Sequence, residues 1–492
     1  MAMLKCVKDP LSPLFMAILL LTALAMASGA ASGPSDSGSS SDGNKGLRGL
    51  STIDASDVFA LLFMMVGLVV ASAGGVGGGT ILVPSMVIML GFDIKQAAPI
   101  SNLAIVGGAV ANAWFNVRKR HPAVDRPLID SDLALAMIPL IMGGAVVGAV
   151  FAKLLPSYLI SLLFVVVLLV GGTRTVVKGI KLHRAETKSH KVQEAAAAAA
   201  AAKEEDQEEP RAAAYVTVCS PTDCVADIDL DEDNSSEDSA NDALLSDAGG
   251  SSSNCSGMGN AEGVLAQITE RERHFSLAKQ GVIVICYFGI VAASIGGAAV
   301  SCGGVAYWLL LLLEIPWVLT FAVATAIYLF RQHRRKLSVN YPFVEGDVHW
   351  TLKTVVRFPL GCAGAGLVAG LFGVGGGIIS GPLMIEMGIV PEVASATTAL
   401  MVLYSSAAAT AKFAVFNMIA WDWATLLCAL AFVVTSVSQV FILSFVRRTG
   451  RQSIIVLCIG ATIWIGTILM TYQAIKSTIS DSGNSFTADV CN

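Results

Sequence analysis

The sequence predicts an all-α polytopic membrane protein with about 10–12 membrane segments, some of them broken or half helices. These segments are expected to form two inverted repeats, each interrupted by a glycine-rich break. Hydrophobic residues make up 54% of the 492 residues and charged residues only 14%, whereas soluble domains carry about 25% charged residues. Several apolar runs are long enough to span a bilayer, and one glycine-rich motif occurs in both halves of the chain.

The glycine-rich motif covers residues 74–84 in the first half and residues 372–382 in the second. The two copies stand in the same register up to a shared proline, and further on Ser101 matches Thr398. Glycine weakens a helix and frees backbone groups that hydrocarbon cannot satisfy. Such breaks are tolerated where they line a cavity, and a matched pair in two halves is the best sequence pointer to a transporter's binding site.

The first 31 residues, 1–31, have the pattern of a secretory signal peptide. Lys5 and Lys8 precede an apolar run over residues 14–26, and an A-x-A-like cleavage site follows at residues 25–27. The alternative is an uncleaved first helix. Residues 32–57 are rich in Ser, Gly and Asp and are predicted to be a disordered extracytosolic segment. The chain is therefore expected to enter the secretory pathway and to reach the plasma membrane or an endomembrane.

The first repeat is predicted over residues 58–182. Its apolar segments are residues 58–73, 80–90, 96–115, 133–153 and 158–178. Residues 183–275 follow as an Ala-rich and acidic loop that is predicted to be disordered and cytosolic. The eight-alanine tract at residues 195–202 favours a helix within this loop, whereas the acidic, Ser-rich part does not.

Residues 276–476 contain the middle segments and the second repeat, and residues 477–492 are an extracytosolic tail. The apolar segments here are residues 277–299, 305–330, 355–371, 378–387, 393–416, 423–445 and 454–475. Pro316 is expected to turn the second of these segments, because proline removes a helix hydrogen bond.

Clusters of basic residues fix the predicted orientation, because cytosolic loops carry an excess of Lys and Arg. The clusters lie in residues 118–126, 178–191, 331–336 and 447–451, which are therefore placed in the cytosol. With that assignment the first repeat begins outside and the second begins inside, so the two repeats are inverted. Inverted repeats are a recurrent plan of secondary transporters that work by alternating access.

The predicted substrate site is built on the two glycine breaks. The free N–H groups and positive dipole ends of the half helices would hold an anion without a full buried cation. The residues assigned to this role are Gly77, Gly78, Gly79 and Thr80 in the first repeat and Gly375, Gly376, Gly377 and Ile378 in the second. The alternative is that these glycines only let helices pack closely.

Polar side chains after the half helices are expected to form a second wall of this site. They are Ser101, Asn102, Ser395, Thr397 and Thr398. Their hydroxyl groups can donate to an oxyanion, or else they bond helix carbonyls as Ser and Thr do in any membrane bundle.

Charged residues inside membrane segments are functional candidates by default. Lys412 would neutralise the anion and Glu386 would carry a coupling proton. The alternative for both is a place near a helix end, from which the side chain snorkels to the interface. Glu314, beside Pro316, is expected at a membrane surface.

No catalytic constellation is present, because the chain lacks H-E-x-x-H, P-loop and G-x-S-x-G motifs. The protein is therefore predicted not to be an enzyme and to need no cofactor. Cys219 and Cys224 lack a second Cys/His pair at zinc-site spacing, so no metal site is predicted. The expected partners are a small anionic substrate and the lipid bilayer, with no nucleic acid; the protein partners of the acidic loop are left open.

The motifs resemble those of the TauE/SafE membrane proteins, often called sulfite exporters. Residues 371–377 (Leu-Phe-Gly-Val-Gly-Gly-Gly) precede a Gly-Pro pair, and residues 391–397 read Pro-Glu-Val-Ala-Ser-Ala-Thr. In the first half, Gly77-Gly78-Gly79 with Pro84 resembles the paired motif. Residues 120–122, 127–130, 305–308 and 315–316 are similar to the eukaryotic, plant-type branch.

The resemblance covers roughly residues 58–182 and 275–475. It implies movement of small sulfur-containing or carboxylate anions, such as sulfite and organosulfonates. We therefore expect a secondary active transporter of small anions of this type, coupled to protons or another ion. The alternatives are a membrane scaffold or receptor that recruits partners through its acidic loop, and a passive anion channel.

Overall fold

The structure, a computed structural model, describes residues 55–73, 75, 77–121, 124–205, 255–298, 300, 304–344, 346–449 and 453–480. The predicted signal peptide, the acidic stretch with its two cysteines and most of the C-terminal tail lie outside the described residues. The chain divides into two compact units. One contains residues 1–186 and 264–492, and the other contains residues 187–263.

The helices of the first half follow the predicted apolar segments closely. They are α2 (Ala55–Ala73), α3 (Gly79–Ile88), α4 (Ile94–Val117), α5 (Ser131–Leu154) and α6 (Ser157–Glu205). The first of them begins inside the segment predicted to be disordered. The last continues to Glu205 and includes the eight-alanine tract, so the helix favoured there by composition is present.

The second half contains eight further described helices. They are α7 (Cys255–Arg273), α8 (Leu277–Ala298), α9 (Val305–Ser338), α10 (Leu352–Phe372), α11 (Gly377–Glu386), α12 (Pro391–Val415), α13 (Trp421–Thr449) and α14 (Ser453–Ser480).

Two features of this half differ from the expectation. The expected turn at Pro316 is wrong, because this proline lies inside the continuous helix α9. Membrane helices tolerate proline because neighbouring helices and local backbone adjustments satisfy the freed backbone groups. Helix α7 also falls within the stretch predicted to be a disordered loop.

The described helices confirm an all-α polytopic membrane protein. Eight of them are long and apolar enough to cross a membrane, and shorter apolar helices cover residues 56–72, 79–88 and 377–386. The half helices α3 and α11 contain 10 residues each, which is too short to span a bilayer. Large apolar side chains such as Phe59, Leu309 and Phe441 face outward, as lipid-facing side chains do.

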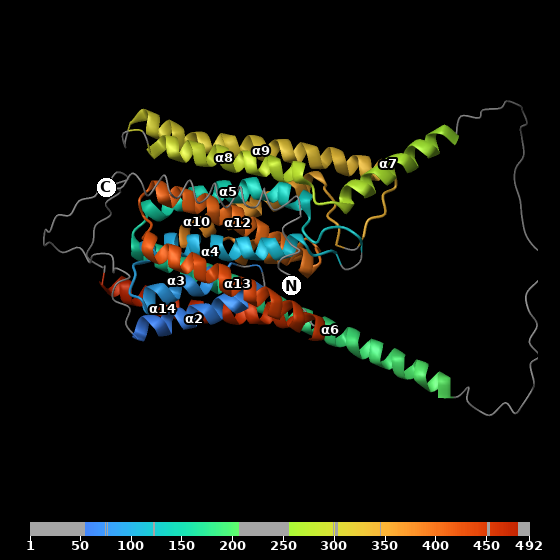
Figure 1. Cartoon of the computed structure of the whole chain (residues 1–492), viewed down its shortest axis with the longest axis horizontal. Helices are drawn as coiled ribbons and strands as arrows, with labels where there is room; N and C mark the ends of the chain where they lie inside the picture. The colour runs from blue at the N-terminus through green and yellow to red at the C-terminus, as the bar shows by residue number, and fades with distance from the viewer. Residues whose placement is uncertain are drawn as a thin grey trace, which may run out of the picture. The chain divides into compact units, whose positions relative to one another are not determined.

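Helices α4 and α12 lie at the centre of the larger unit (Figure 1). The most apolar window of each is 83% buried, the highest value among the spanning helices. Helix α5 packs against α10 and α12 on one side of this centre, and α13 packs against α2 and α4 on the other. The hairpin of α8 and α9 lies against α5, and α8 also contacts α12.

Helices α5 and α10 approach each other through glycines. A Cβ atom added to Gly366 would lie 2.0 Å from the carbonyl oxygen of Ile141, and one added to Gly370 would lie 1.9 Å from that of Ala145. Gly144 and Gly148 approach α10 in the same way. Small residues spaced four apart let two membrane helices touch through their backbones, so this contact leaves no room for a side chain.

Candidate functional site

The two glycine breaks begin α3 and α11 in the same way. The residue before each helix, Gly78 or Gly376, is left-handed, with φ of 78° and 68° respectively. Only glycine adopts this conformation at little cost. No side chain caps either helix N-terminus, although the first helical residues are buried. A buried helix end without a cap leaves N–H groups available to a ligand.

The two breaks, distant in the sequence, contact each other at the centre of the unit. A Cβ atom added to Gly79 would lie 2.6 Å from the carbonyl oxygen of Gly373. One added to Gly77 would lie 3.0 Å from both Ile105 and Val402, and one added to Gly375 would lie 3.0 and 3.1 Å from the same two residues. The breaks therefore cross between α4, which carries Ile105, and α12, which carries Val402.

The contacts around the crossing are reciprocal. Gly373 of the second break packs against the backbone oxygen of Ala98 on α4, 2.4 Å from an added Cβ. Gly75 of the first break packs against the backbone oxygen of Ser395 on α12, at 2.5 Å. Each break is therefore held by the long central helix from the other half of the chain.

The predicted hydroxyl residues mostly bond nearby groups rather than point into open space. Ser101 donates to the Gly373 carbonyl at 2.8 Å. Thr397 accepts from the backbone N–H of Asp130 at 3.3 Å, and Thr398 donates to the sulfur of Met384 at 3.7 Å. Ser101 thus makes the carbonyl bond that the alternative interpretation of these residues expects.

Asn102 differs from its predicted companions. Its side chain is fully buried, and neither its amide oxygen nor its amide nitrogen has a hydrogen-bond partner within the described part of the chain. Buried amides are nearly always hydrogen-bonded. The residue that follows Ser101 therefore has two N–H donors without a partner among the described residues, and an anion accepts hydrogen bonds from such donors.

A small cavity of about 10 Å³ lies beside the first break, with room for about one water molecule. Ser72, Gly75, Gly77, Asn112 and Thr435 are among the residues that line it. Ser72, Asn112 and Thr435 are not predicted from the sequence, because no motif marks them. The signal available for Asn112 was a polar residue inside a membrane segment.

A chain of hydrogen bonds leads from this cavity to the basic loop after α4. Gln439 donates to Asn112 Oδ1 at 2.7 Å and to the carbonyl of Ser72 at 3.0 Å. Asn116 also donates to Asn112 Oδ1, at 3.2 Å. Lys119 Nζ donates to Asn116 at 2.8 Å and to Gln439 at 3.2 Å. We call these five residues the amide chain; it joins α2, α4 and α13.

Lys412, predicted to neutralise the substrate, is buried but bonds another group. Its ammonium lies 2.7 Å from the carboxylate of Glu314 on α9 and 3.4 Å from the hydroxyl of Ser294 on α8. Both charged side chains are only 4% exposed. The expectation that Glu314 faces a membrane surface is wrong, because α12 supplies it with a buried cation that the sequence does not reveal.

Glu386, predicted to carry a coupling proton, lies at the end of α11. Its side chain is 47% exposed and pairs with Lys178 at 3.2 Å. Lys178 also donates to the carbonyl of Pro382 at 2.6 Å. This arrangement matches the alternative in which the carboxylate lies near a helix end, and exposed pairs of this kind contribute little energy.

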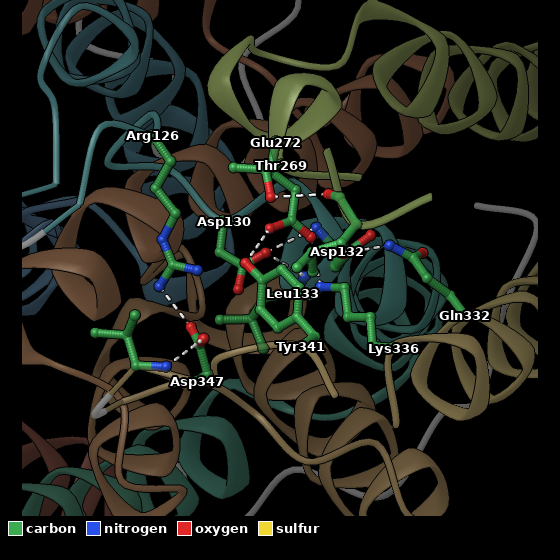
Figure 2. A network of polar contacts seen from close by, with 12 residues as sticks. Arg126, Asp130, Asp132, Leu133, Thr269, Glu272, Gln332, Lys336, Tyr341 and Asp347 are labelled. Atoms are coloured by element: carbon green, nitrogen blue, oxygen red, sulfur yellow. Dashed lines mark hydrogen bonds and ion pairs between the residues drawn. The ribbon is translucent and has the colours of Figure 1, made fainter. Parts of the chain in front are cut away.

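A second, charged cavity of about 80 Å³ lies at the N-terminus of α5. Figure 2 shows its polar contacts. Three ion pairs of 2.5 Å cross it: Arg126 with Asp347, Lys279 with Asp132, and Lys336 with Glu272. They tie α5 to α8, the loop before α5 to the loop after α9, and α7 to α9. The basic residues here are predicted only as topology signals, so this cluster is not predicted from the sequence.

Asp130 lies in the charged cavity and caps α5. Its carboxylate accepts from the backbone N–H groups of Asp132 and Leu133, at 2.8 and 3.2 Å. Burial raises the pKa of this carboxyl group, and the neighbouring charge of Asp132 adds to the shift. The two backbone bonds and Arg126 oppose it. Among the described residues, no group of three His, Cys, Asp or Glu side chains is placed to hold a metal ion.

Comparison with known proteins gives one family. The model of the sulfite exporter TauE/SafE family matches residues 58–213 and 247–465. The Arabidopsis thaliana sulfite exporter TauE/SafE family protein 3 is 28% identical over 84% of this chain and 77% of its own length. Family proteins 2 and 1 of the same plant are each 27% identical, over 85% and 86% of this chain and 83% and 85% of their own lengths. No solved structure matches.

Proposed function

The chain belongs to the sulfite exporter TauE/SafE family, and on that premise we propose that it is a secondary active transporter of small sulfur-containing anions. The family and the multiple apolar helices make it a multi-pass integral membrane protein. The proposed substrates are sulfite, which the names of its relatives include, and the chemically similar organosulfonates. Transport is coupled to a proton or ion gradient, across the plasma membrane or an endomembrane.

The contact between the two breaks is the observation that carries this proposal. Two half helices begin at this crossing with buried, uncapped N-termini. Their N–H groups and dipole ends favour an anion. The unpartnered amide of Asn102 adds donors beside the second break. Such a site holds an oxyanion with neutral groups, so the bound charge is compensated without a fixed cation in the site.

The reciprocal packing of the breaks supports alternating access between two inverted repeats. Gly77 and Gly375 meet the same pair of residues, Ile105 and Val402, from the two repeats. A substrate at this crossing is contacted by both repeats at once. Rocking of one repeat against the other then opens the site to one side of the membrane at a time.

The test is flux of radiolabelled sulfite, taurine, sulfate and a carboxylate in proteoliposomes, with and without a pH gradient. Gly79→Ala places a Cβ atom 2.6 Å from the Gly373 carbonyl, whereas Gly364→Ala, also in a helix, meets nothing within 4 Å. We expect Gly79→Ala to slow flux by at least about tenfold, since a misplacement of 1 Å can cost roughly a hundredfold. Gly364→Ala should match wild type.

Three results would contradict the proposal. If no anion is transported and the protein's cellular role is lost when residues 187–263 are deleted, the result would favour a scaffold. Purely downhill, electrogenic flux would identify a passive channel. Equal flux in the two glycine variants would remove the crossing as the substrate site.

A further inference from the structure

We propose that Glu314, together with Ser294 and Lys412, forms the binding site of the coupling proton. This inference rests on the proposed function and names the coupling group of that transport. It replaces Glu386, whose half-exposed carboxylate pairs with a surface lysine. The proton-binding site is thus placed on the α8–α9 hairpin and not on a half helix.

The three side chains form a closed cluster. Lys412 Nζ lies 2.7 Å from Glu314 Oε1, and Ser294 Oγ donates to the same oxygen at 2.8 Å. Lys412 Nζ also donates to Ser294 Oγ at 3.4 Å. Both bonds to the carboxylate therefore reach Oε1, and Oε2 takes part in neither. Oε2 is the atom to which a proton adds without breaking the contact with Ser294.

The burial of this cluster argues against a purely structural role. Replacement of a buried ion pair by apolar residues of similar volume is often neutral or stabilising, because the desolvation of two charges offsets their attraction. Ionisable groups within membrane segments are accordingly rare and tend to mark proton relays and ion pathways. A cluster that only joined α8, α9 and α12 would be made more simply from apolar side chains.

Helix α12 links the cluster to the substrate site. Ser405, seven residues before Lys412, donates to the carbonyl of Gly375 in the second break at 3.4 Å. Seven residues make about two helical turns, so the two side chains share a face roughly 10 Å apart along the axis. In a low-dielectric interior a charge acts over that distance. The charge state of the cluster therefore influences an anion at the crossing.

The charges balance in the following cycle. With Glu314 ionised, the pair with Lys412 is neutral overall and gives no net attraction for an anion. A proton from water adds to Oε2 and makes the carboxyl group neutral, so the ammonium of Lys412 is left uncompensated. One monovalent anion at the crossing then restores neutrality. Release of the anion and loss of the proton on the other side return the pair to its starting state, with one proton moved per anion.

The groups that contact Glu314 come from two other helices. Lys412 lies on α12 and Ser294 on α8. A further cation, Lys153 on α5, lies 5.1 Å from the centre of the Phe416 ring, while Lys412 lies 5.7 Å from the same ring. Once Glu314 is protonated, two cations therefore lie near this end of α12, at a distance from the crossing where the anion binds.

The first test reads the proton directly and needs no substrate. Infrared difference spectra of the full-length protein in lipid vesicles, between mildly alkaline and mildly acidic buffer, should contain a buried protonated-carboxyl band. This band should be lost in Glu314→Gln and kept in Glu386→Gln, the matched control. Because burial raises the pKa of the Asp130 carboxyl group, which can give such a band, both variants are made in an Asp130→Asn background. Retention of the band in Glu314→Gln on that background would overturn the inference, whether or not any anion is transported.

The second test reads coupling. In proteoliposomes, Glu314→Gln should lose accumulation of sulfite driven by a pH gradient, while it still exchanges internal for external sulfite. Glu314→Asp should restore that accumulation. Where the single variant does not fold, Glu314→Gln with Lys412→Met removes both charges and takes its place. Gradient-driven accumulation equal to wild type would overturn the inference, while absence of flux in wild type itself would count against the proposed function alone.

Discussion

The two sides of the crossing share a backbone plan but differ in what fills it. Ser438 of α13 donates to the carbonyl of Val69 on α2 at 2.9 Å. When α13 and α5 are aligned from their first residues, Trp421 and Ser131, Ser438 corresponds to Gly148. Gly148 lies against the carbonyl of Leu367 on α10, 2.2 Å from an added Cβ. A hydroxyl group therefore bonds the helix carbonyl on one side, whereas on the other side the two helix backbones are in direct contact.

The difference extends along the whole interface. The glycine-rich motifs, the pair Ser101 and Thr398, and the first residues of α5 and α13 align the two halves of the chain. In this alignment the positions of Ser72, Asn112, Asn116, Lys119 and Gln439 correspond to Gly370, Ala409, Phe413, Phe416 and Ala149. The side formed by α2, α4 and α13 is thus polar and contains the amide chain. The side formed by α5, α10 and α12 is close-packed. This difference indicates a polar route to the breaks on one side and a dry contact on the other.

The largest effect is expected where the close-packed side is disturbed. Gly370→Ala would place a Cβ atom 1.9 Å from the carbonyl oxygen of Ala145, and we expect it to destabilise the protein by about 3 kcal/mol. At the matching position Ser72→Ala removes a hydroxyl 2.7 Å from Ser438 and should cost only about 1 kcal/mol. Thermal unfolding of the purified protein in detergent measures both. Equal losses would mean that the two sides do not differ in packing, and Gly364→Ala is the control.

The next effect concerns the cooperativity of the amide chain. Asn112→Ala leaves donors of Gln439 and Asn116 unsatisfied, so we expect a loss of about 2 kcal/mol. Gln439→Ala should cost a similar amount. Because the two side chains bond each other, the double variant should lose less than the sum, with a coupling energy of about 1 kcal/mol. If the losses of the two single variants add strictly in the unfolding measurements, the amide chain is a set of independent hydrogen bonds.

The smallest effect is expected at Asp130, the buried carboxylate that caps α5. The acidic residue near the N-terminus of α13, Asp422, is exposed instead. The folded-state pKa of Asp130 is raised, so the folded state binds more protons than the unfolded state. The stabilisation that Asp130 contributes is therefore fully present at pH values below its pKa in the unfolded state. It is lost as pH rises through its pKa in the folded state. Asp130→Asn keeps the cap and should be the more stable protein at neutral pH. A wild-type advantage at neutral pH would contradict this sign.

The sequence by itself determined the membrane class, the positions of nearly all described helices and the place of the two breaks. These are local properties, because hydropathy over a window and clustered glycines act on the chain near them. The family resemblance rested on the same local motifs, and the family match confirms it. The turn predicted at Pro316 is wrong because proline breaks helices in soluble proteins, whereas in a membrane bundle neighbouring helices satisfy the backbone groups that proline frees.

Only the tertiary structure decided which polar groups meet. The pair of Glu314 and Lys412 joins helices far apart in the sequence, and the amide chain joins α2 to α13 near the two ends of the chain. Such contacts depend on the rotation of each helix about its axis and on which helices become neighbours. A sequence records periodicity along one helix, but it does not record the partner across an interface. The difference between the polar and the close-packed side of the crossing is decided at that level.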